Sequence, residues 1–349
     1  MMEDALTRQT AERLIEAAIE APSIHNSQPW QFVARPADRV IEVYADPART
    51  PRRGDPRGRA VHIACGSALF NLRLAAAQAG CEPVARLLPC PRDPLLLASV
   101  RLAGPYRPRP AERDLYAAIH RPPSRRPFSG RPLPRGLTSA LREAAALEGA
   151  SLRQPGQADA LRILRRSAAA DPGLGADPGY LAELTAWTGG LQPGGKRGTG
   201  KVPAMRGLLP GPGSGPRPAA VPGAGSRLAV ISTAADDRAS WLRAGQAAQR
   251  VLLLAAHRGL PAALLSPALE PPGAPAHGDP VLDCEHPAVI LRFGCERQEP
   301  APGRRPVAQV LRLDPGPNQL TGFPVGPEER RPPARRSGGR WPAGERVSR

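Results

Sequence analysis

The residues best suited to hold a ligand lie in one short stretch, APSIHNSQPWQF, at positions 21–32. Its middle is polar, and the side-chain amide of Asn26 can both donate and accept hydrogen bonds. Trp30 follows a proline at the mouth of an apolar, strand-like segment, where a surface loop has no need of a large aromatic ring. The stretch therefore predicts a polar loop that covers a ligand with a flat face. The alternative is that Ser23 and Asn26 only cap a helix and a turn.

The charge of the chain points to an anionic partner. Its 349 residues carry a formal net charge of +17, which suits phosphate esters, nucleic acid or acidic lipid. Aromatic residues make up only 4%, too few for stacking platforms on single-stranded nucleic acid, and no zinc-finger or RNA-recognition spacing is present. We therefore expect a phosphate site rather than a nucleic-acid surface. A basic nucleic-acid-binding protein is kept as a third alternative for the function.

The sequence shows no pattern typical of disulfides, metal sites, nucleophilic catalysis or nucleotide-binding loops. The five cysteines are an odd number without a C-x-x-C pair, and the six histidines have no metal-ligand spacing, so we expect reduced thiols and no metal. Neither a G-x-S-x-G elbow nor a P-loop is present. The start of the chain reads as a soluble helix rather than an export signal, and we expect no membrane span. These features predict a cytoplasmic protein.

The pattern of apolar and turn residues predicts the elements that position the loop. Strands are expected at 31–46 (two, around the turn RPAD), 82–89, 94–102, 227–234 and 286–296. Helices are expected within 1–30 and at 60–80, 114–121, 135–150, 161–170, 180–190 and 238–260. A flap or irregular insertion is expected at 191–225, a closing segment GRRPVAQVLRL at 303–313, and a disordered basic tail at 314–349.

The two long helices suggest an internal duplication. GSALFNLRLAAAQAG and GQAAQRVLLLAAHRG share the plan G-x-A-x-x-x-x-x-L-x-A-A-x-x-G. The predicted halves are residues 1–105 and 106–313, followed by the tail. The alternative is a chance likeness, because Ala/Leu-rich helices resemble one another.

Three motifs together resemble a known family. APSIHNSQPWQF resembles the A-P-S-x-x-N-x-Q-P-W-x-F signature of FMN-dependent nitroreductases. HRPPSRRPFSGRPLP resembles their R-x-S-x-R-x-F-x-x-x-P-x-P segment, and GRRPV resembles their C-terminal arginine segment. The order of the motifs is similar to that of the fused, Acg-like branch, in which one chain replaces a homodimer. The resemblance implies an α+β, nitroreductase-like fold, internally duplicated as a pseudo-dimer, with antiparallel-containing sheets flanked by helices.

The resemblance also implies a site with one FMN per chain, in a cleft between the halves. The residues expected to bind the phosphate are Arg121, Arg304 and Arg305. Those expected at the pyrimidine edge of the ring are Ser124, Arg125 and Arg126. Those expected to cover the ring are Pro22, Ser23, Ile24 and Asn26. Leu265, Ser266 and Glu270 are expected beside the flavin, with an ordinary helix-to-strand loop as the alternative.

The implied activity is a ping-pong hydride transfer. NAD(P)H would reduce FMN, which would then reduce a small-molecule electron acceptor such as a nitroaromatic or a quinone. The alternative function is a storage protein that sequesters FMN without turnover. The resemblance leaves two oligomeric states open, a monomeric pseudo-dimer and a dimer of fused chains.

Overall fold

The computed structural model has two units, residues 1–316 and 317–349, and all of its described residues belong to the first. They are mixed α and β, and every strand pair but one is antiparallel, so the expected α+β class with antiparallel-containing sheets is confirmed. The described residues are 6–50, 52–120, 133, 135–156, 158–160, 162–163, 179, 227–265, 286–293 and 303–314.

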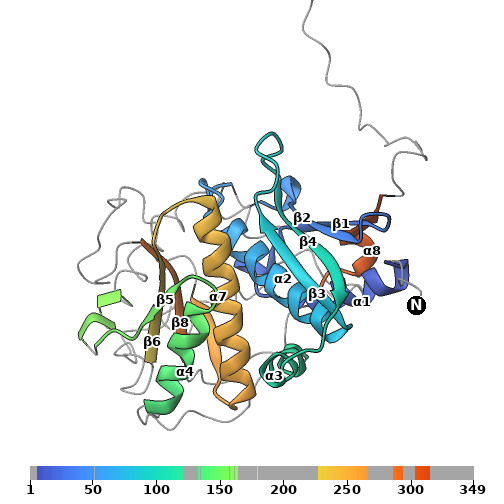
Figure 1. Cartoon of the computed structure of the whole chain (residues 1–349). Coiled ribbons are helices and arrows are strands. Elements are labelled where there is room, and N and C mark those ends of the chain that lie inside the picture. Colours follow the sequence, from blue (N-terminus) through green and yellow to red (C-terminus); the bar gives the residue numbers. More distant parts are fainter. Residues whose placement is uncertain are drawn as a thin grey trace, which may run out of the picture. The chain divides into compact units, whose positions relative to one another are not determined.

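The first sheet is built mainly from the N-terminal third of the chain. Its order is β3-β4-β2-β1-β9, and helices α1 and α2 pack against it (Figure 1). Strand β9 comes from the far end of the chain and pairs parallel to β1, with Phe32 opposite Leu311. The elements of this part are α1 (Arg8–Ala18), η1 (Ile24–Asn26), β1 (Trp30–Arg35), β2 (Val40–Ala45), η2 (Pro47–Arg49), α2 (Arg59–Gln78), β3 (Cys81–Leu87), β4 (Leu96–Pro105), α8 (Val307–Val310) and β9 (Leu311–Leu313).

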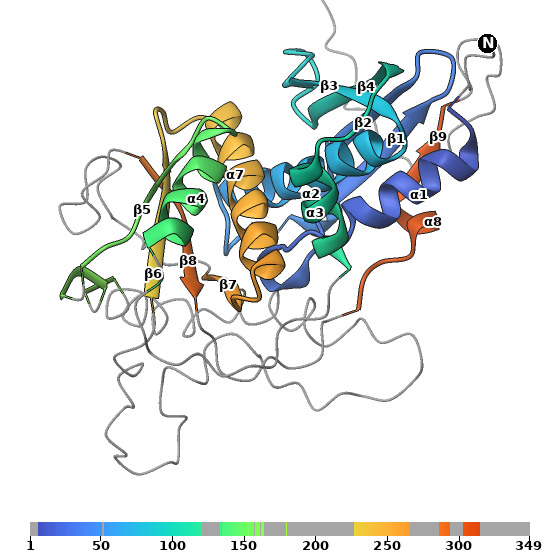
Figure 2. The ribbon, with the colours of Figure 1, turned by 60° about the horizontal axis from the view of Figure 1, so that its bottom comes forward.

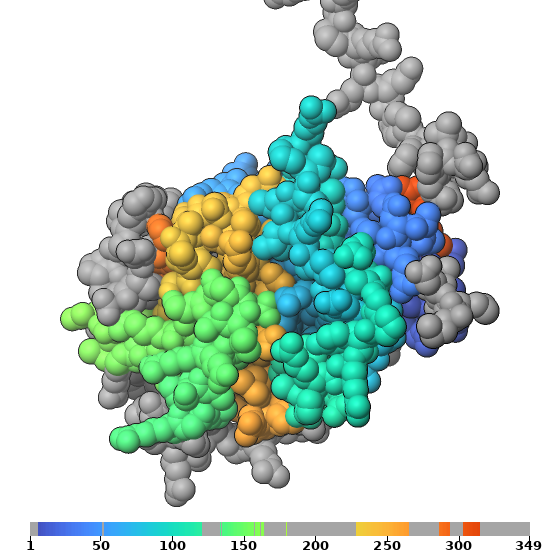
Figure 3. Space-filling model, in the orientation of Figure 1, coloured from blue at the N-terminus to red at the C-terminus, as the bar shows by residue number. Residues whose placement is uncertain are grey.

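The second sheet has the order β5-β6-β8-β7, and helices α4 and α7 pack against it. In Figure 3 residues of α7 reach the surface between the green segment of α4 and the teal segment of α3. The elements are α3 (Pro110–Ile119), α4 (Arg135–Ala146), β5 (Ser151–Arg153), β6 (Arg227–Thr233), α7 (Arg238–His257), β7 (Ala262–Leu265) and β8 (His286–Phe293).

The two sheets repeat one plan. Along the chain, α1-β1-β2-α2-β3-β4 is followed by α4-β5-β6-α7-β7-β8. The strand order β3-β4-β2-β1 corresponds term by term to β7-β8-β6-β5. Among the described strands only β9 has no counterpart, because it adds a strand beside β1 and none is seen beside β5. Each half therefore has its own sheet and helix pair, and the halves differ at this one edge.

Helices α2 and α7 lie side by side between the two sheets (Figure 2). A Cβ atom on Gly66 would lie 2.2 Å from the carbonyl oxygen of Leu242, and one on Gly245 would lie 2.1 Å from that of Ile63. The two glycines thus let each helix backbone touch the other in a reciprocal way. Ser67 Oγ also donates to the Gly245 carbonyl at 3.0 Å.

Facing residues on this helix pair, and in the turns just before the two helices, are complementary. Arg57 and Asp236, 179 positions apart, form an ion pair at 2.8 Å. His62 and Trp241 have the same separation, and their rings meet edge to face with centroids 5.5 Å apart. Gly66 and Gly245 also have this separation. Positions that the sequence repeat makes equivalent therefore lie opposite each other across the helix pair.

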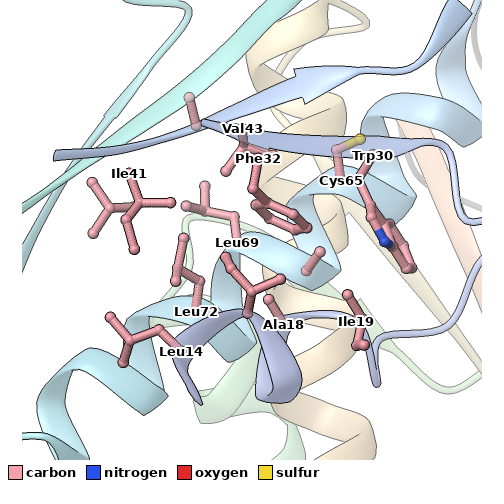
Figure 4. Packing of buried hydrophobic residues seen from close by; sticks show 14 of the residues in the cluster. Leu14, Ala18, Ile19, Trp30, Phe32, Ile41, Val43, Cys65, Leu69 and Leu72 are labelled. Atoms are coloured by element: carbon pink, nitrogen blue, oxygen red, sulfur yellow. The ribbon is translucent and has the colours of Figure 1, made fainter. Parts of the chain in front are cut away.

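The core of the first half lies between its sheet and its helices. Figure 4 shows Phe32 and Leu69 pointing into this layer, and Trp30 is also fully buried. Cys65 is buried here too, and burial raises the pKa of its thiol. Of the described helices, α2 alone is long and apolar enough to cross a membrane, which the sequence reading did not foresee. In its most apolar window 83% of the residues are buried, as in a core helix.

Most predicted elements are confirmed within the described residues. The turn RPAD joins β1 to β2, and the two long helices are α2 and α7. Strand β3 ends earlier than expected, because Leu88 has a left-handed backbone (φ 48°). The prediction for residues 180–190, the flap at 191–225 and the tail beyond Asp314 lie outside the described residues, as does most of 161–170.

We expect Gly66→Ala and Gly245→Ala each to destabilise the protein strongly, by about 1–3 kcal/mol or more, because the new methyl group would overlap a backbone carbonyl that cannot move alone. Thermal unfolding followed by circular dichroism measures the effect. Gly136→Ala is the control, since a Cβ there meets nothing within 4 Å and lies in α4. A melting temperature unchanged in the first two variants would show that the helices are not in backbone contact.

Asp236→Asn should also destabilise the fold, by about 1–3 kcal/mol near neutral pH. Burial raises the pKa of Asp236, but the Trp241 indole N–H at 2.7 Å and Arg57 outweigh it, so the net pKa is lowered. The stabilisation is therefore complete above about pH 4 and fades as the pH falls through the folded-state pKa. Denaturant unfolding across pH should show the gap to wild type closing on acidification. Asp38→Asn, at an exposed acid, should show no such gap.

Candidate functional site

The loop between α1 and β1 has an unusual backbone. Three of its non-glycine residues are left-handed: His25 (φ 49°), Asn26 (φ 56°) and Gln28 (φ 49°). Such a conformation costs about 1–2 kcal/mol per residue, so tertiary contacts must hold it. One of them is local, since the backbone N–H of Gln28 donates to Ser23 Oγ at 3.0 Å. Strain of this kind is typical of functional loops.

The C-terminal arginine segment contacts this loop from the other end of the chain. Asn26 Nδ2 donates to the Gly303 carbonyl at 3.0 Å, and Arg304 Nη1 donates to Asn26 Oδ1 at 2.9 Å. The amide of Asn26 thus uses both its donor and its acceptor on one segment, 277 and 278 positions away. Two motifs that the sequence singled out separately therefore meet.

Arg304 lies at the edge of the loop and is partly buried. Its side chain is 20% exposed, and Nη2 donates to the backbone carbonyl of Glu20 at 2.8 Å. Its Nε lies 3.5 Å from Glu20 Oε2, an ion pair without a good hydrogen bond. Burial lowers the pKa of Arg304, and the Glu20 carboxylate opposes this effect. Arg304 is thus a cation fixed by two neutral acceptors and one loosely held carboxylate.

Arg305 is directed into the protein. Its backbone N–H donates to Gln28 Oε1 at 2.7 Å, and Nη1 donates to the Gln28 carbonyl at 3.1 Å and to Asp46 Oδ2 at 3.3 Å. Nη2 donates to the Gln309 carbonyl at 3.3 Å. The guanidinium is buried, and burial lowers its pKa against the opposing effect of Asp46. Both Nη atoms of its guanidinium donate to protein acceptors, and these hydrogen bonds anchor β9 to the loop.

Arg49 is a cation of the site that the sequence reading did not single out. Asp46 caps the short helix η2 by accepting from the Ala48 N–H at 3.1 Å, and η2 carries Arg49 back to the loop. There Arg49 Nη1 donates to the Ser27 carbonyl at 2.8 Å. Burial lowers the pKa of Arg49, and the nearby Arg305 charge lowers it further. The sequence feature that could have pointed to Arg49 is its position three residues after Asp46, which caps the short helix.

Two buried polar atoms, at the end of the loop and the start of β1, have no hydrogen-bond partner among the described residues. They are the hydroxyl of Ser27 and the indole N–H of Trp30, both on fully buried side chains. Buried side-chain atoms of the same kind occur away from the loop, at Gln154 and Gln249, so these two do not by themselves mark a ligand site. Gln28 and Trp30 are both fully buried, so they are structural residues of the site.

The remaining predicted site residues separate into three groups. Pro22, Ser23 and Asn26 are half-buried in the loop, whereas Ile24 is buried. Leu265 ends β7 and is paired with Ile290 in the second sheet. Those that lie outside the described residues are Arg121, Ser124, Arg125, Arg126, Ser266 and Glu270.

Known proteins resemble this chain over most of its length. It is 33% identical over 273 residues to "Putative NAD(P)H nitroreductase Rv3131" of Mycobacterium tuberculosis (strain ATCC 25618 / H37Rv), covering 75% of this chain and 77% of that protein. It is 28% identical over 333 residues to "Putative NAD(P)H nitroreductase acg" of the same strain, covering 90% of this chain and 98% of that protein. No family model matches the chain.

Arg305→Gln should destabilise the protein by about 3–5 kcal/mol, because it leaves Asp46 buried without its cation and frees β9 from the loop. Urea unfolding measures the loss. The stability of Arg305→Lys should lie between that of wild type and that of Arg305→Gln, since lysine keeps the positive charge but loses the paired N–H donors of the guanidinium. Arg312→Gln, on the exposed face of β9, is the matched control. Equal stability of the Arg305 and Arg312 variants would contradict the anchoring role.

Proposed function

The chain belongs to the nitroreductase superfamily, in its Acg-like branch, and from this premise we propose that it is an FMN-dependent oxidoreductase that passes electrons from NAD(P)H to a small acceptor. The observation that carries the proposal is the contact between Asn26 and Arg304, at which two family motifs from opposite ends of the chain meet. Fold-level likeness alone would not support a function, whereas a site assembled from separate motifs does.

The described residues of the site fit an anionic, hydrogen-bonding ligand. The FMN phosphate carries close to two negative charges, and the guanidinium of Arg304, whose side chain is 20% exposed, can bind it through charge-assisted hydrogen bonds. Arg49 adds a second positive charge beside the loop. When bound, FMN supplies the hydride chemistry.

The roles of the residues follow from these positions. Arg304 holds the phosphate, and Asn26 keeps the Arg304 guanidinium in place from the loop. Arg305 anchors the segment rather than binding the ligand, because its fork is directed to protein acceptors. Pro22 and Ser23 cover the ring. The predicted roles of Arg121, Ser124, Arg125, Arg126, Leu265, Ser266 and Glu270 stay predictions.

An internal duplication with a single surviving site accounts for the asymmetry of the halves. The matching strand orders and the reciprocal contacts of Gly66 and Gly245 on α2 and α7 support the duplication. Residues 19–29 join α1 to β1, but only residues 147–150 join α4 to β5, too few for a counterpart of the loop. The C-terminal segment reaches the first sheet alone. We therefore expect one FMN per chain.

The reaction then needs no side-chain nucleophile. A flavin held at this site would supply the hydride chemistry between NAD(P)H and a nitroaromatic or quinone-like acceptor, in a ping-pong sequence. The buried Cys65 thiol, with its raised pKa, has no part in this chemistry. The protein binds the flavin, orients it and keeps its phosphate at Arg304.

Arg304→Gln should weaken FMN binding about 10- to 100-fold, since it removes a charge-assisted contact worth about 1.5–3 kcal/mol. Binding of riboflavin, which lacks the phosphate, should not change. Quenching of flavin fluorescence on titration measures both affinities. Arg13→Gln, at an exposed position of α1, is the charge-matched control. An unchanged FMN affinity in the Arg304 variant would place the phosphate elsewhere.

A further inference from the structure

We propose that Glu20 competes with the flavin phosphate for Arg304, because its carboxylate lies 3.5 Å from the guanidinium Nε and a bound phosphate would displace it. The inference rests on the proposed function and adds to it a residue that tunes the affinity for FMN.

The placement of Glu20 argues for such a role. Helix α1 is capped by Ile19, so Glu20 stands directly at the C-terminal end of the helix. Helix C-termini carry partial negative charge, and a carboxylate there is unfavourable unless a cation offsets it. Its nearest cation is Arg304, 3.5 Å away, which also holds the Glu20 carbonyl at 2.8 Å. The acid is therefore retained at a position where helix stability alone would disfavour it.

The ion pair between Glu20 and Arg304 is weak enough for a phosphate to replace it. The two good hydrogen bonds of Arg304 go to neutral oxygens of Asn26 and Glu20, and these fix the plane of the guanidinium. The Glu20 carboxylate faces only Nε, at a distance longer than a good hydrogen bond. The Glu20 side chain is 37% exposed, so it can turn into solvent at little cost. A phosphate offers more charge and three acceptor oxygens to the same cation.

A simple positioning role is the competing explanation. If Glu20 only orients Arg304, removing its charge loosens the guanidinium and weakens binding of FMN. If Glu20 competes with the phosphate, removing its charge strengthens binding. The sign of the effect separates the two accounts.

The experiment is a titration of wild type and of Glu20→Gln with FMN and with riboflavin. We expect FMN to bind about 3- to 10-fold more tightly to the variant, and riboflavin to bind equally to both. Glu16→Gln, an exposed acid on the same helix, is the matched control and should change neither affinity. In an Arg304→Gln background the Glu20 substitution should have no effect on FMN.

A second readout does not depend on flavin. Inorganic phosphate should raise the melting temperature of Glu20→Gln more than that of wild type. Failure of both proteins to bind FMN, with this phosphate effect present, would overturn the proposed function and leave the role of Glu20 intact. Equal or weaker FMN binding in Glu20→Gln, or an equal phosphate effect in both proteins, would overturn the role of Glu20.

Discussion

The return of the C-terminal segment to the first sheet is the constraint on which the site depends. Strand β9 pairs with β1, and the buried guanidinium of Arg305 ties that segment to the loop through Gln28 and Asp46. A buried cation without acceptors would be costly, so the loop must keep its strained conformation to supply them. This tie brings Arg304 against Asn26. Arg305 therefore anchors the segment, whereas Arg304 lies at the edge of the loop, where we propose that it binds the phosphate.

The two halves are more complementary to each other than two identical halves would be. Gly66 and Gly245 permit reciprocal backbone contact, as in a symmetric dimer. At other equivalent positions the residues are complementary, with Arg57 opposite Asp236 and His62 opposite Trp241. A pair of identical first halves would instead set arginine against arginine. Complementarity of this kind favours the pairing of two different halves within one chain.

The sequence predicted the elements with regular periodicity, and the family resemblance assigned the loop and GRRPV to one flavin site without predicting the contact between them. Helices α2 and α7 and the strands around RPAD were readable because burial imposes a repeat on their residues. The sequence did not show that Arg305 is buried and Arg304 lies at the edge of the loop. That difference depends on which guanidinium contacts Asp46 after β9 pairs with β1. Arg49 could not be predicted for the same reason, since a tertiary hydrogen bond to the Ser27 carbonyl holds it beside the loop.

The most direct test of the account is the absorbance spectrum of the protein after FMN is added and excess flavin is removed, recorded again after anaerobic addition of NADPH or NADH. The account predicts that one FMN per chain is retained and that its bands bleach with the nicotinamide. Retained bands that do not bleach would favour flavin storage over reduction. A protein that retains no flavin would contradict the central claim that the loop and the arginine segment form a flavin site.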